Sequence, residues 1–243
     1  MAESTSINIF EILKKELTNL TIKPGEKLEE AEMCERFSVT RPPIRTVFQR
    51  LQDIGLLEVV PYKGATATLI SLSSVHQIIH LRTAVEAWII RDFIASSPSM
   101  IDLEEMEHNV RLQKLIYQQP IVDEKEFFRL DSALHQFWFD RMNCSGIWQM
   151  IQSDLNYERF RMLDFVGTQG YVNIVKDHEK LLDAIRNSRS EDIVPILSVH
   201  LNAGLARMGN LIRNDYKEYF TLDEENNEYW VNYNAKLAGL KRK

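Results

Sequence analysis

The 243-residue chain has few cysteines and no long apolar run, and each of these features excludes some classes of protein. Its two cysteines, Cys34 and Cys144, are far apart in sequence and form no CxxC pair, which favours a reduced compartment. No apolar stretch approaches the roughly 20 residues that cross a membrane. The N-terminal residues lack the basic and apolar regions of a signal peptide. We therefore expect a cytoplasmic protein without a membrane partner.

The composition is otherwise that of an ordinary globular protein, with 44% hydrophobic and 26% charged residues. Its length permits one large domain or two smaller ones. The formal net charge of −6 argues against indiscriminate binding of nucleic acids. It does not exclude a local basic patch, because contact with DNA depends on how charge is distributed.

One stretch, residues 36–50, contains no acidic residue and carries four arginines. These are Arg36, Arg41, Arg45 and Arg50. Thr40 is a good N-cap and the two prolines after Arg41 fit a first helical turn, so the stretch predicts a helix. Arg41 and Arg45 share one edge of this helix, and apolar residues on its other side would pack against a core. Arginines at the leading end of a packed helix are suited to reading the major groove, whereas a solvated basic face is the alternative.

The segments around this helix predict a winged helix-turn-helix over residues 1–72. Two further helices and two strands are expected, over residues 7–20, 29–37, 56–60 and 65–69. The two strands are joined by a turn and form a hairpin wing. Lys63, at the tip of this wing, would meet a phosphate or a groove edge.

Four short motifs in these residues resemble the DNA-binding domain of GntR-type bacterial transcription regulators. They lie at residues 23–28, 39–45, 51–56 and 62–65. The resemblance implies a set of operator-facing residues on the third helix and at the wing: Thr40, Arg41, Pro43, Arg45, Lys63 and Gly64. Arg36 and Arg50 complete the set of DNA-binding candidates. Ala31 occupies a position where some relatives have a DNA-contacting arginine, so we expect that contact to be absent.

From Ser73 onward glycine becomes sparse and strand signals fade, which predicts an all-α domain. Six helical segments are expected, over residues 73–96, 101–118, 123–142, 146–166, 171–188 and 190–214. Prolines and glycines mark several of the breaks between them. We therefore predict a mainly α chain, in which a six-helix bundle over 73–220 follows the winged helix-turn-helix and a C-terminal extension covers 221–243.

Four polar residues of the helical region fall in the middle of apolar stripes. Asp131 and His135 form a DxxxH pair one helical turn apart, flanked by apolar residues. His178 and His200 are each surrounded by aliphatic residues on their own helices. A lone histidine in such a position is usually a satisfied core residue. Three histidines with an aspartate indicate a metal site instead, because burying Asp131 without a cation would cost several kcal/mol.

The expected site has groups that can hold a divalent metal and an organic acid. Zinc is the first choice, with nickel, manganese or iron as alternatives, and an exogenous oxygen ligand fits a five- or six-coordinate ion. Arg82 also leans inward on its helix and could bind a carboxylate through two hydrogen bonds. A pair between Arg82 and Glu86 at the helix surface is the alternative. Arg207, which lies near His200 on its helix, has the same ambiguity.

The same helices resemble FCD, the ligand-binding domain of the FadR branch of the GntR family. The resemblance rests on residues 81–86, 131–135, 177–185 and 199–201, and it spans about residues 75–215. It implies a divalent metal with four protein ligands, namely Asp131, His135, His178 and His200. It also implies an organic acid that ligates the metal from a cavity. With six helices expected rather than seven, the domain resembles the VanR-like group of that branch.

These predictions lead to a DNA-binding transcriptional regulator, which we expect to act as a repressor. Short palindromic operators are read by two copies of such a domain, so we expect a homodimer on double-stranded DNA. A small organic acid at the metal, contacted by Arg82 and Arg207, would control operator affinity. A metal sensor, whose effector is the ion itself, is one alternative. A metalloenzyme fused to a DNA-binding module is another, but no further inward-facing carboxylate stands out as a general base, so we expect no enzyme.

Overall fold

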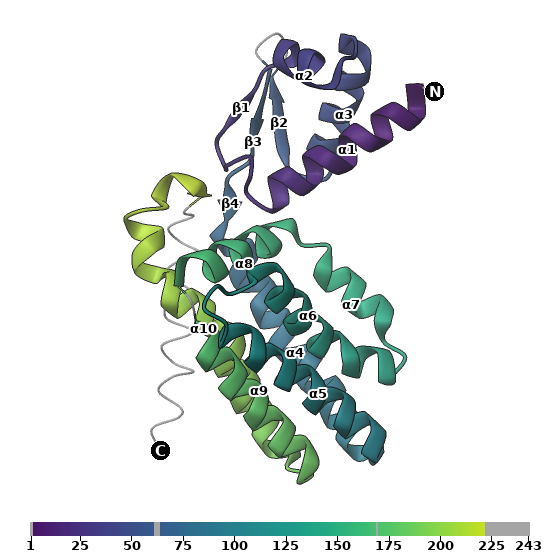
Figure 1. Cartoon of the computed structure of the whole chain (residues 1–243), viewed down its shortest axis with the longest axis vertical. Helices are drawn as coiled ribbons and strands as arrows, with labels where there is room; N and C mark the ends of the chain where they lie inside the picture. The colour runs from purple at the N-terminus through teal and green to yellow at the C-terminus, as the bar shows by residue number, and fades with distance from the viewer. Residues whose placement is uncertain (1, 61–63, 169, 222–243) are drawn as a thin grey trace. The chain divides into compact units, whose positions relative to one another are not determined.

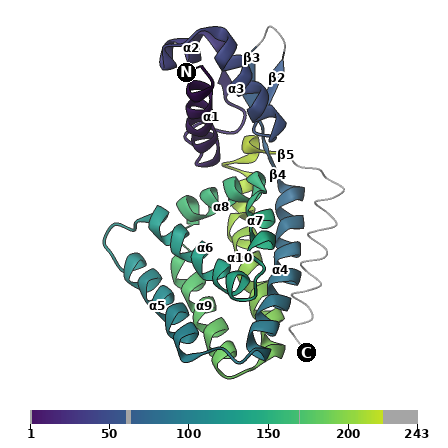
Figure 2. The same ribbon diagram turned by 90° about the vertical axis from the view of Figure 1, so that its right-hand side faces the viewer.

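The computed structural model describes residues 2–60, 64–168 and 170–221, with side chains described for 7–60, 64–164 and 170–221. The chain divides into two compact units (Figures 1 and 2). The first comprises the described residues of Met1–Val75, Leu155–Met162 and Leu211–Lys243, and the second comprises those of His76–Asp154 and Leu163–Asn210. Lys63, expected at the tip of the wing, lies outside the described residues.

The N-terminal unit contains the predicted winged helix-turn-helix. Its helices are α1 (Ala2–Thr18), α2 (Glu30–Phe37) and α3 (Arg41–Asp53), and its strands are β1 (Lys27–Leu28), β2 (Leu57–Val60) and β3 (Gly64–Ala67). The strands form an antiparallel sheet in the order β1-β3-β2. The pair β2–β3 is the predicted hairpin, whereas β1 is an additional strand that the hydropathy pattern did not indicate.

The local sequence explains how α3 begins and packs. Ser38 has a left-handed conformation (φ 53°), which turns the chain sharply between α2 and α3. Thr40 is the N-cap of α3, as predicted, although its hydroxyl makes no capping hydrogen bond. Prolines occupy the first turn, where their missing N–H groups cost little. The helix buries four apolar residues in a core shared with α1, which leaves the edge with Arg41 and Arg45 exposed. The four are Ile44, Val47, Phe48 and Leu51.

The described residues of the second unit are helical, as predicted. The helices from this part of the chain are α4 (Leu72–Ala95), α5 (Met100–Tyr117), α6 (Glu124–Arg141), α7 (Ser145–Gln152), α8 (Leu155–Thr168), α9 (Tyr171–Arg186) and α10 (Ile193–Arg213). A short 3-10 helix, η1 (Ser190–Asp192), precedes α10. The helix α5 packs along both α6 and α9 (Figures 1 and 2). The helices α4, α8 and α10 each contribute residues to both units.

Seven α-helices, rather than the six predicted, follow β4 within the described part of the chain. The segment expected at 146–166 is divided into α7 and α8 at Ser153 and Asp154. The Ser153 hydroxyl donates to the carbonyl of Met150 (2.7 Å), so a side chain takes up a carbonyl at the end of α7. The Asp154 N–H bonds to the carbonyl of Ile151 (3.4 Å), three residues back, which ends the α-helical spacing. The count of six helices, on which the likeness to the VanR-like group rested, is therefore not found.

The segment that precedes α4 is held by residues from the second half of the chain. Its strand β4 (Ile70–Ser71) pairs in parallel with β5 (Phe220–Thr221), which follows the 3-10 helix η2. Arg159 of α8 is buried, and its guanidinium donates to the carbonyls of Thr68 (2.7 Å) and Leu69 (3.4 Å). These contacts fix the path of the chain between the wing and α4.

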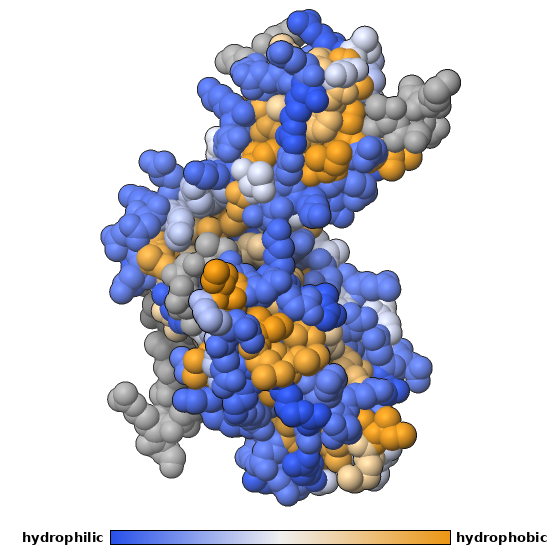
Figure 3. All heavy atoms as spheres, viewed as in Figure 1, coloured by the Kyte–Doolittle hydropathy of each residue, from blue (hydrophilic) through white to orange (hydrophobic). Residues whose placement is uncertain are grey.

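Hydrophobic residues reach the surface in separate patches on both units (Figure 3). Exposed examples in the helical unit include Trp88 of α4, Met100 of α5 and Met150 of α7. Scattered apolar side chains of this kind are common on protein surfaces. Within the described ranges, no helix is both long and apolar enough to cross a membrane.

Arg159→Met should lower the free energy of unfolding by about 2–4 kcal/mol. The substitution removes a buried guanidinium and leaves backbone carbonyls without their hydrogen-bond donor. Urea denaturation at pH 7 measures the change, with Arg91→Met, at an exposed arginine of α4, as the control. A change within about 0.5 kcal/mol in both variants would contradict this role for Arg159.

Acid should destabilise the protein in part through His76 of α4. Burial lowers the pKa of His76 to about 4 from an ordinary value of 6.5, so the unfolded chain gains a proton here at a higher pH than the folded protein does. Stability is therefore lost as the pH falls from 6.5 towards 4. His76→Gln should reduce the loss by about 1–2 kcal/mol at pH 5, measured by urea denaturation at pH 7 and pH 5. The exposed His80→Gln is the matched control, and an unaltered pH dependence in His76→Gln would show that this histidine is not responsible.

Candidate metal centre and nucleic-acid interface

Two candidate DNA-contacting arginines lie along the exposed edge at the start of α3. Arg41 is the first residue of the helix and is exposed. Arg45 lies one turn further on, and its Nε donates to both carboxylate oxygens of Glu30, at 3.0 and 3.1 Å. Because Glu30 begins α2, this ion pair joins the two helices of the helix-turn-helix. The Arg45 side chain is still 62% exposed and is therefore accessible to DNA.

The other two arginines of the basic stretch contact α1. Arg36, near the end of α2, donates from both terminal nitrogens to Glu16 (2.8 Å for Nη1–Oε2), and this hydrogen bond raises the pKa of Arg36. The Arg50 guanidinium lies 4.0 Å from the centre of the Phe10 ring. These contacts attach α2 and α3 to α1. They make Arg36 and Arg50 less accessible to a base edge than the residues at the start of α3.

The remaining DNA candidates lie at the start of α3 and at the wing. Thr40 is exposed, and Pro43 is half-buried in the first turn. Gly64 begins β3 with a φ of +88°, and a Cβ there would lie 3.0 Å from a carbonyl oxygen of β1. A side chain at this position would therefore strain the backbone and disturb the strand pairing. The structure does not describe Lys63, so its part in the wing stays a prediction.

The four residues predicted to bind metal come together in the helical unit. Asp131 and His135 lie on α6, His178 lies on α9 and His200 lies on α10, and all four are buried. One potential ligand atom from each residue lies within 4.8 Å of those from the other three. Apolar neighbours on the same helices, such as Phe127 on α6, face the core and carry the polar groups inward with them.

Two of the separations between the potential ligand atoms are close to those in a tetrahedral metal site. The Nε2 atoms of His135 and His200 are 3.1 Å apart. His178 Nε2 is 3.5 Å from a carboxylate oxygen of Asp131. Nitrogen or oxygen ligands about 2.0–2.1 Å from zinc in a tetrahedral site are roughly 3.3 Å from one another. The residues present therefore fit a divalent metal in the type, number and spacing of their ligand atoms.

The surroundings of His200 favour the neutral form that binds metals. Burial lowers the pKa of His200 well below its ordinary value, and His178 and His135 lower it further. Its Nδ1 is buried and makes no hydrogen bond to any residue that the structure describes. The imidazole is therefore neutral near pH 7, which is the state a metal requires.

A second buried carboxylate, Glu86 of α4, lies beside the cluster. One of its oxygens accepts a hydrogen bond from Arg82 Nη2 (3.1 Å), and the other contacts His135 Nδ1. Burial alone would raise the pKa of Glu86, but the charges and hydrogen bonds of His135 and Arg82 outweigh burial and lower it. This inward-facing carboxylate did not stand out from the sequence pattern. The sequence feature that could have indicated it is the four-residue spacing of Arg82 and Glu86 among apolar residues of one helix face.

Both arginines that were expected to contact an acid have partners inside the protein. Arg82 is 1% exposed and forms the i,i+4 pair with Glu86, in the core rather than at the helix surface. Arg207 pairs with Asp164 of α8, with 3.1 Å between Nε and the carboxylate. A Cβ at Gly170 would lie 2.7 Å from Arg207 Nε, so this glycine permits the close approach of the guanidinium. Arg82 is linked to the four-residue cluster through Glu86.

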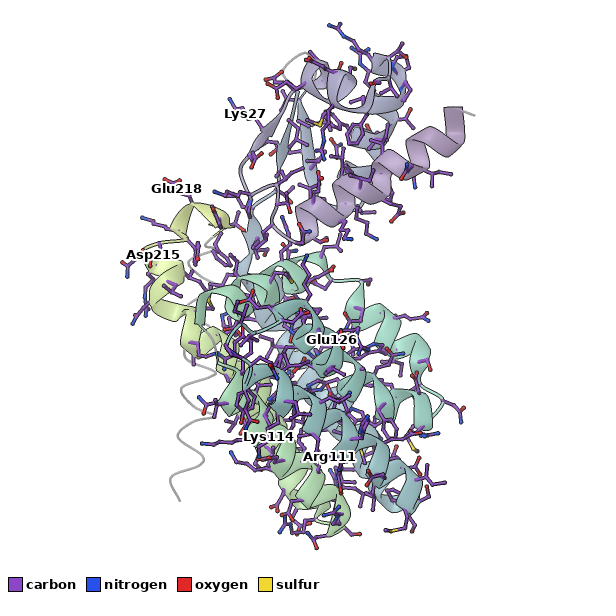
Figure 4. All side chains as sticks on the ribbon, in the orientation of Figure 1. Lys27, Arg111, Lys114, Glu126, Asp215 and Glu218 are labelled. Carbon is purple, nitrogen blue, oxygen red and sulfur yellow. The ribbon has the colours of Figure 1, made fainter. Side chains whose placement is uncertain are left out.

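Gln113 of α5 is another buried polar residue beside the cluster. Its Oε1 lies 2.8 Å from His178 Nδ1. A glutamine in a helix carries no sequence signal of such a role. By contrast, Arg111 and Lys114 of the same helix lie on the outside of the unit, as does Glu126 of α6 (Figure 4). The polar groups around the cluster are therefore separate from the charged outer surface.

Two families match this chain. Residues 5–66 match the family described as bacterial regulatory proteins, gntR family, and residues 77–203 match the FCD domain. The HTH-type transcriptional repressor RspR of Escherichia coli (strain K12) is 25% identical over 214 residues, which cover 88% of this chain and 92% of RspR. The uncharacterized HTH-type transcriptional regulator YdhC of Bacillus subtilis (strain 168) is 22% identical over 198 residues, which cover 81% of this chain and 87% of YdhC.

Solved structures of GntR regulators have a similar fold. The E. coli McbR/YncC structure has a TM-score of 0.63 and 16% identity, and the match covers 85% of this chain and 97% of that one. A transcriptional regulator GntR from Rhodococcus sp. RHA1 has a TM-score of 0.62 and 18% identity, with 85% and 98% covered. The FCD match alone covers just over half of the sequence, and a GntR match precedes it. The chain therefore belongs to the GntR family of bacterial regulators: it is a DNA-binding transcriptional regulator with an FCD domain and not an enzyme.

Proposed function

We propose that this regulator is a repressor that binds a short palindromic operator as a homodimer and responds to a small organic acid at a divalent metal. Zinc is the first candidate, with nickel, manganese and iron as alternatives. The observation that carries the proposal is the convergence of four buried ligand groups from three helices. The relative RspR is named a repressor, which supports the direction of regulation.

The metal would be held by one carboxylate oxygen and three imidazole nitrogens. These belong to Asp131, His135, His178 and His200. When bound, the ion would supply a concentrated positive charge and a coordination position for an oxygen ligand. A five- or six-coordinate ion would therefore accept a carboxylate without losing a protein ligand.

The buried charges around the cluster favour an anionic ligand. Asp131 and Glu86 are both buried carboxylates, and Arg82 supplies one positive charge beside them. Together with a divalent ion, these two carboxylates and the guanidinium would carry one net positive charge. The carboxylate of an organic acid would neutralise that charge. We propose Arg82 and Arg207 as further contacts of the acid, because a guanidinium has five N–H groups and can bridge two acids.

The proposed operator contacts lie on α3 and at the wing. Those at the start of α3 are Thr40, Arg41, Pro43 and Arg45, and those at the wing are Lys63 and Gly64. Arg36 and Arg50 would add positive charge beside them. Two copies of α3 related by a two-fold axis would match a palindromic operator. The net charge of −6 keeps non-specific affinity low, so binding depends on this local surface.

Ligand binding and operator binding would be coupled through an equilibrium between two arrangements of the dimer. An acid that binds one arrangement more tightly shifts the population towards it. Coupling of this kind typically changes affinity by about 5- to 150-fold. A metal sensor is the second candidate, because the four ligand groups would bind an ion without help from an acid.

Arg45→Ala should weaken operator binding by about 10- to 100-fold without unfolding the protein. The side chain is exposed, whereas the opposite face of α3 is buried in the core. An operator is first selected from random duplex DNA, affinity is measured by gel shift, and circular dichroism checks the fold. Arg129→Ala, at an exposed arginine of α6, changes the charge equally and is the control. Unchanged affinity in Arg45→Ala would refute the assignment of α3 as the recognition helix.

His178→Ala should bind metal at least 10-fold more weakly than the wild-type protein, because the site loses one of four ligands. Elemental analysis after dialysis against a fixed zinc concentration measures the occupancy. The exposed His108→Ala of α5 is the matched control. Full occupancy in His178→Ala would exclude this residue from the site, and a metal-free wild-type protein would overturn the proposed metal.

The same proteins separate control by an acid from metal sensing. Acids that bind are found by thermal shift on metal-loaded protein, since a specific ligand raises the melting temperature. Operator affinity is then measured without metal, with metal, and with metal and acid. A change that requires the acid and disappears in His178→Ala supports the proposal. A complete change with metal alone favours the sensor.

A further inference from the structure

Two buried polar side chains contact the candidate metal ligands from behind. Glu86 of α4 meets His135, and Gln113 of α5 meets His178. In both cases the contact is made to Nδ1, the ring nitrogen that faces away from the other ligands. Both side chains are 0% exposed, so water does not compete for these hydrogen bonds.

The contact of Gln113 has a defined direction because it ends a chain of hydrogen bonds. Asn109 Nδ2 donates to the carbonyl of Leu130 (3.1 Å), and a carbonyl can only accept. The oxygen of the Asn109 amide therefore faces Gln113 and accepts from its Nε2 (2.7 Å). The oxygen of Gln113 must then face His178, and it can only accept as well. The proton of neutral His178 is consequently on Nδ1, and the lone pair is on Nε2.

The contact of Glu86 has the same effect on His135. One carboxylate oxygen accepts from Arg82 Nη2 (3.1 Å), and the other contacts His135 Nδ1. An ionised carboxylate can only accept, so Nδ1 of His135 must be the donor. The lone pair of neutral His135 is then on Nε2, which lies 3.1 Å from Nε2 of His200.

His200 differs from the other two histidines. Its Nδ1 is buried and forms no hydrogen bond among the residues that the structure describes. Because His135 Nε2 has the lone pair, His200 Nε2 must be the donor in their contact, and no side chain in that set holds the His200 proton on Nδ1. This histidine has to adopt the metal-binding tautomer when the ion arrives, whereas the other two already have it.

We propose that Glu86 and Gln113 are positioning residues that hold His135 and His178 in the Nδ1–H tautomer, so that both Nε2 lone pairs are ready for the metal before it binds. This inference rests on the proposed metal site. Outer hydrogen-bond partners of this kind typically change metal affinity by about 10- to 100-fold. Asn109 has the supporting role of orienting the Gln113 amide through the Leu130 carbonyl, which lies one residue before Asp131 in α6.

The sharpest test is Glu86→Gln, which has nearly the same shape and the opposite effect on the tautomer. Arg82 can only donate, so the amide oxygen must face Arg82 and the amide NH2 must face His135. This arrangement forces His135 to accept at Nδ1 and places its proton on Nε2. Gln113→Leu removes the acceptor of His178 without adding a charge.

Zinc affinity is measured by competition with a chelator. The proteins compared are the wild type, Glu86→Gln, Gln113→Leu and a control, Gln149→Leu, which changes an exposed residue of α7. We expect zinc to bind about 10- to 100-fold more weakly to Glu86→Gln and to Gln113→Leu than to the wild type, and equally well to the control. Nitrogen-15 NMR of the metal-free proteins at pH 8 reports the tautomers independently of metal binding. His135 should change from Nδ1–H to Nε2–H in Glu86→Gln.

The outcomes separate this inference from the proposal on which it rests. A wild-type protein that binds none of zinc, nickel, manganese and iron would overturn the metal site itself. Zinc affinity and histidine tautomers that match the wild type in both variants would overturn only the positioning role. If Gln113→Leu fails to fold, Asn109→Ala tests the same chain of hydrogen bonds at a half-buried position, with weaker zinc binding expected and unchanged binding contradicting the role of Gln113.

Discussion

Two carboxylates are buried around His135 in the helical core, and the cost of keeping them ionised governs the whole site. Glu86 offsets that cost through Arg82 and His135. Asp131 is surrounded by imidazoles, and burial keeps the pKa of His200 too low for that ring to carry a compensating charge near neutral pH. A buried carboxylate without a compensating cation costs several kcal/mol. The proposed divalent ion would interact favourably with Asp131 and with the facing imidazole nitrogens together.

The helix α4 takes part in the candidate site although it supplies no metal ligand. It runs from Leu72 to Ala95, it carries Arg82 and Glu86, and it follows β4 directly. The chain reaches it from the DNA-binding helices through the segment that β5 and Arg159 hold. Coupling between two sites requires an element with two arrangements that both sites bias. The contact between Glu86 and His135 is the point at which metal binding would act on α4.

Patterns that depend on one helix at a time could be predicted from the sequence. The start of α3 at Thr40 and the inward direction of Asp131 and His135 follow from caps and apolar stripes, which are local properties. The division between α7 and α8 was missed because it depends on the Ser153 hydroxyl taking up a carbonyl, and serine is common within helices. The strand β1 was missed because two residues are too few to show alternation.

The surroundings of the candidate site were harder to predict because they depend on how helices meet. The spacing of Arg82 and Glu86 suggested a pair, but a pair at this spacing is usually on the surface, and only packing shows that it is buried. Gln113 carries no signal, since its role arises from the meeting of α5 with α6 and α9. The ligands of a site can thus be recognised by residue type, whereas the groups that orient them are recognised only by contact.

The glutamates beside the basic stretch would allow an acidic protein to bind DNA selectively through the proposed surface. Arg36 pairs with Glu16 and Arg45 pairs with Glu30, so both guanidinium groups are held in place before DNA arrives. Exposed ion pairs of this type contribute about 0–1 kcal/mol, so giving up Glu30 for a base edge or a phosphate costs little. The same glutamates would repel phosphates that approach in any other register, which would penalise non-specific complexes more than the proposed operator complex. In the proposed operator complex, selectivity would therefore depend on where Arg41 and Arg45 lie on α3 and not on the total charge of the protein.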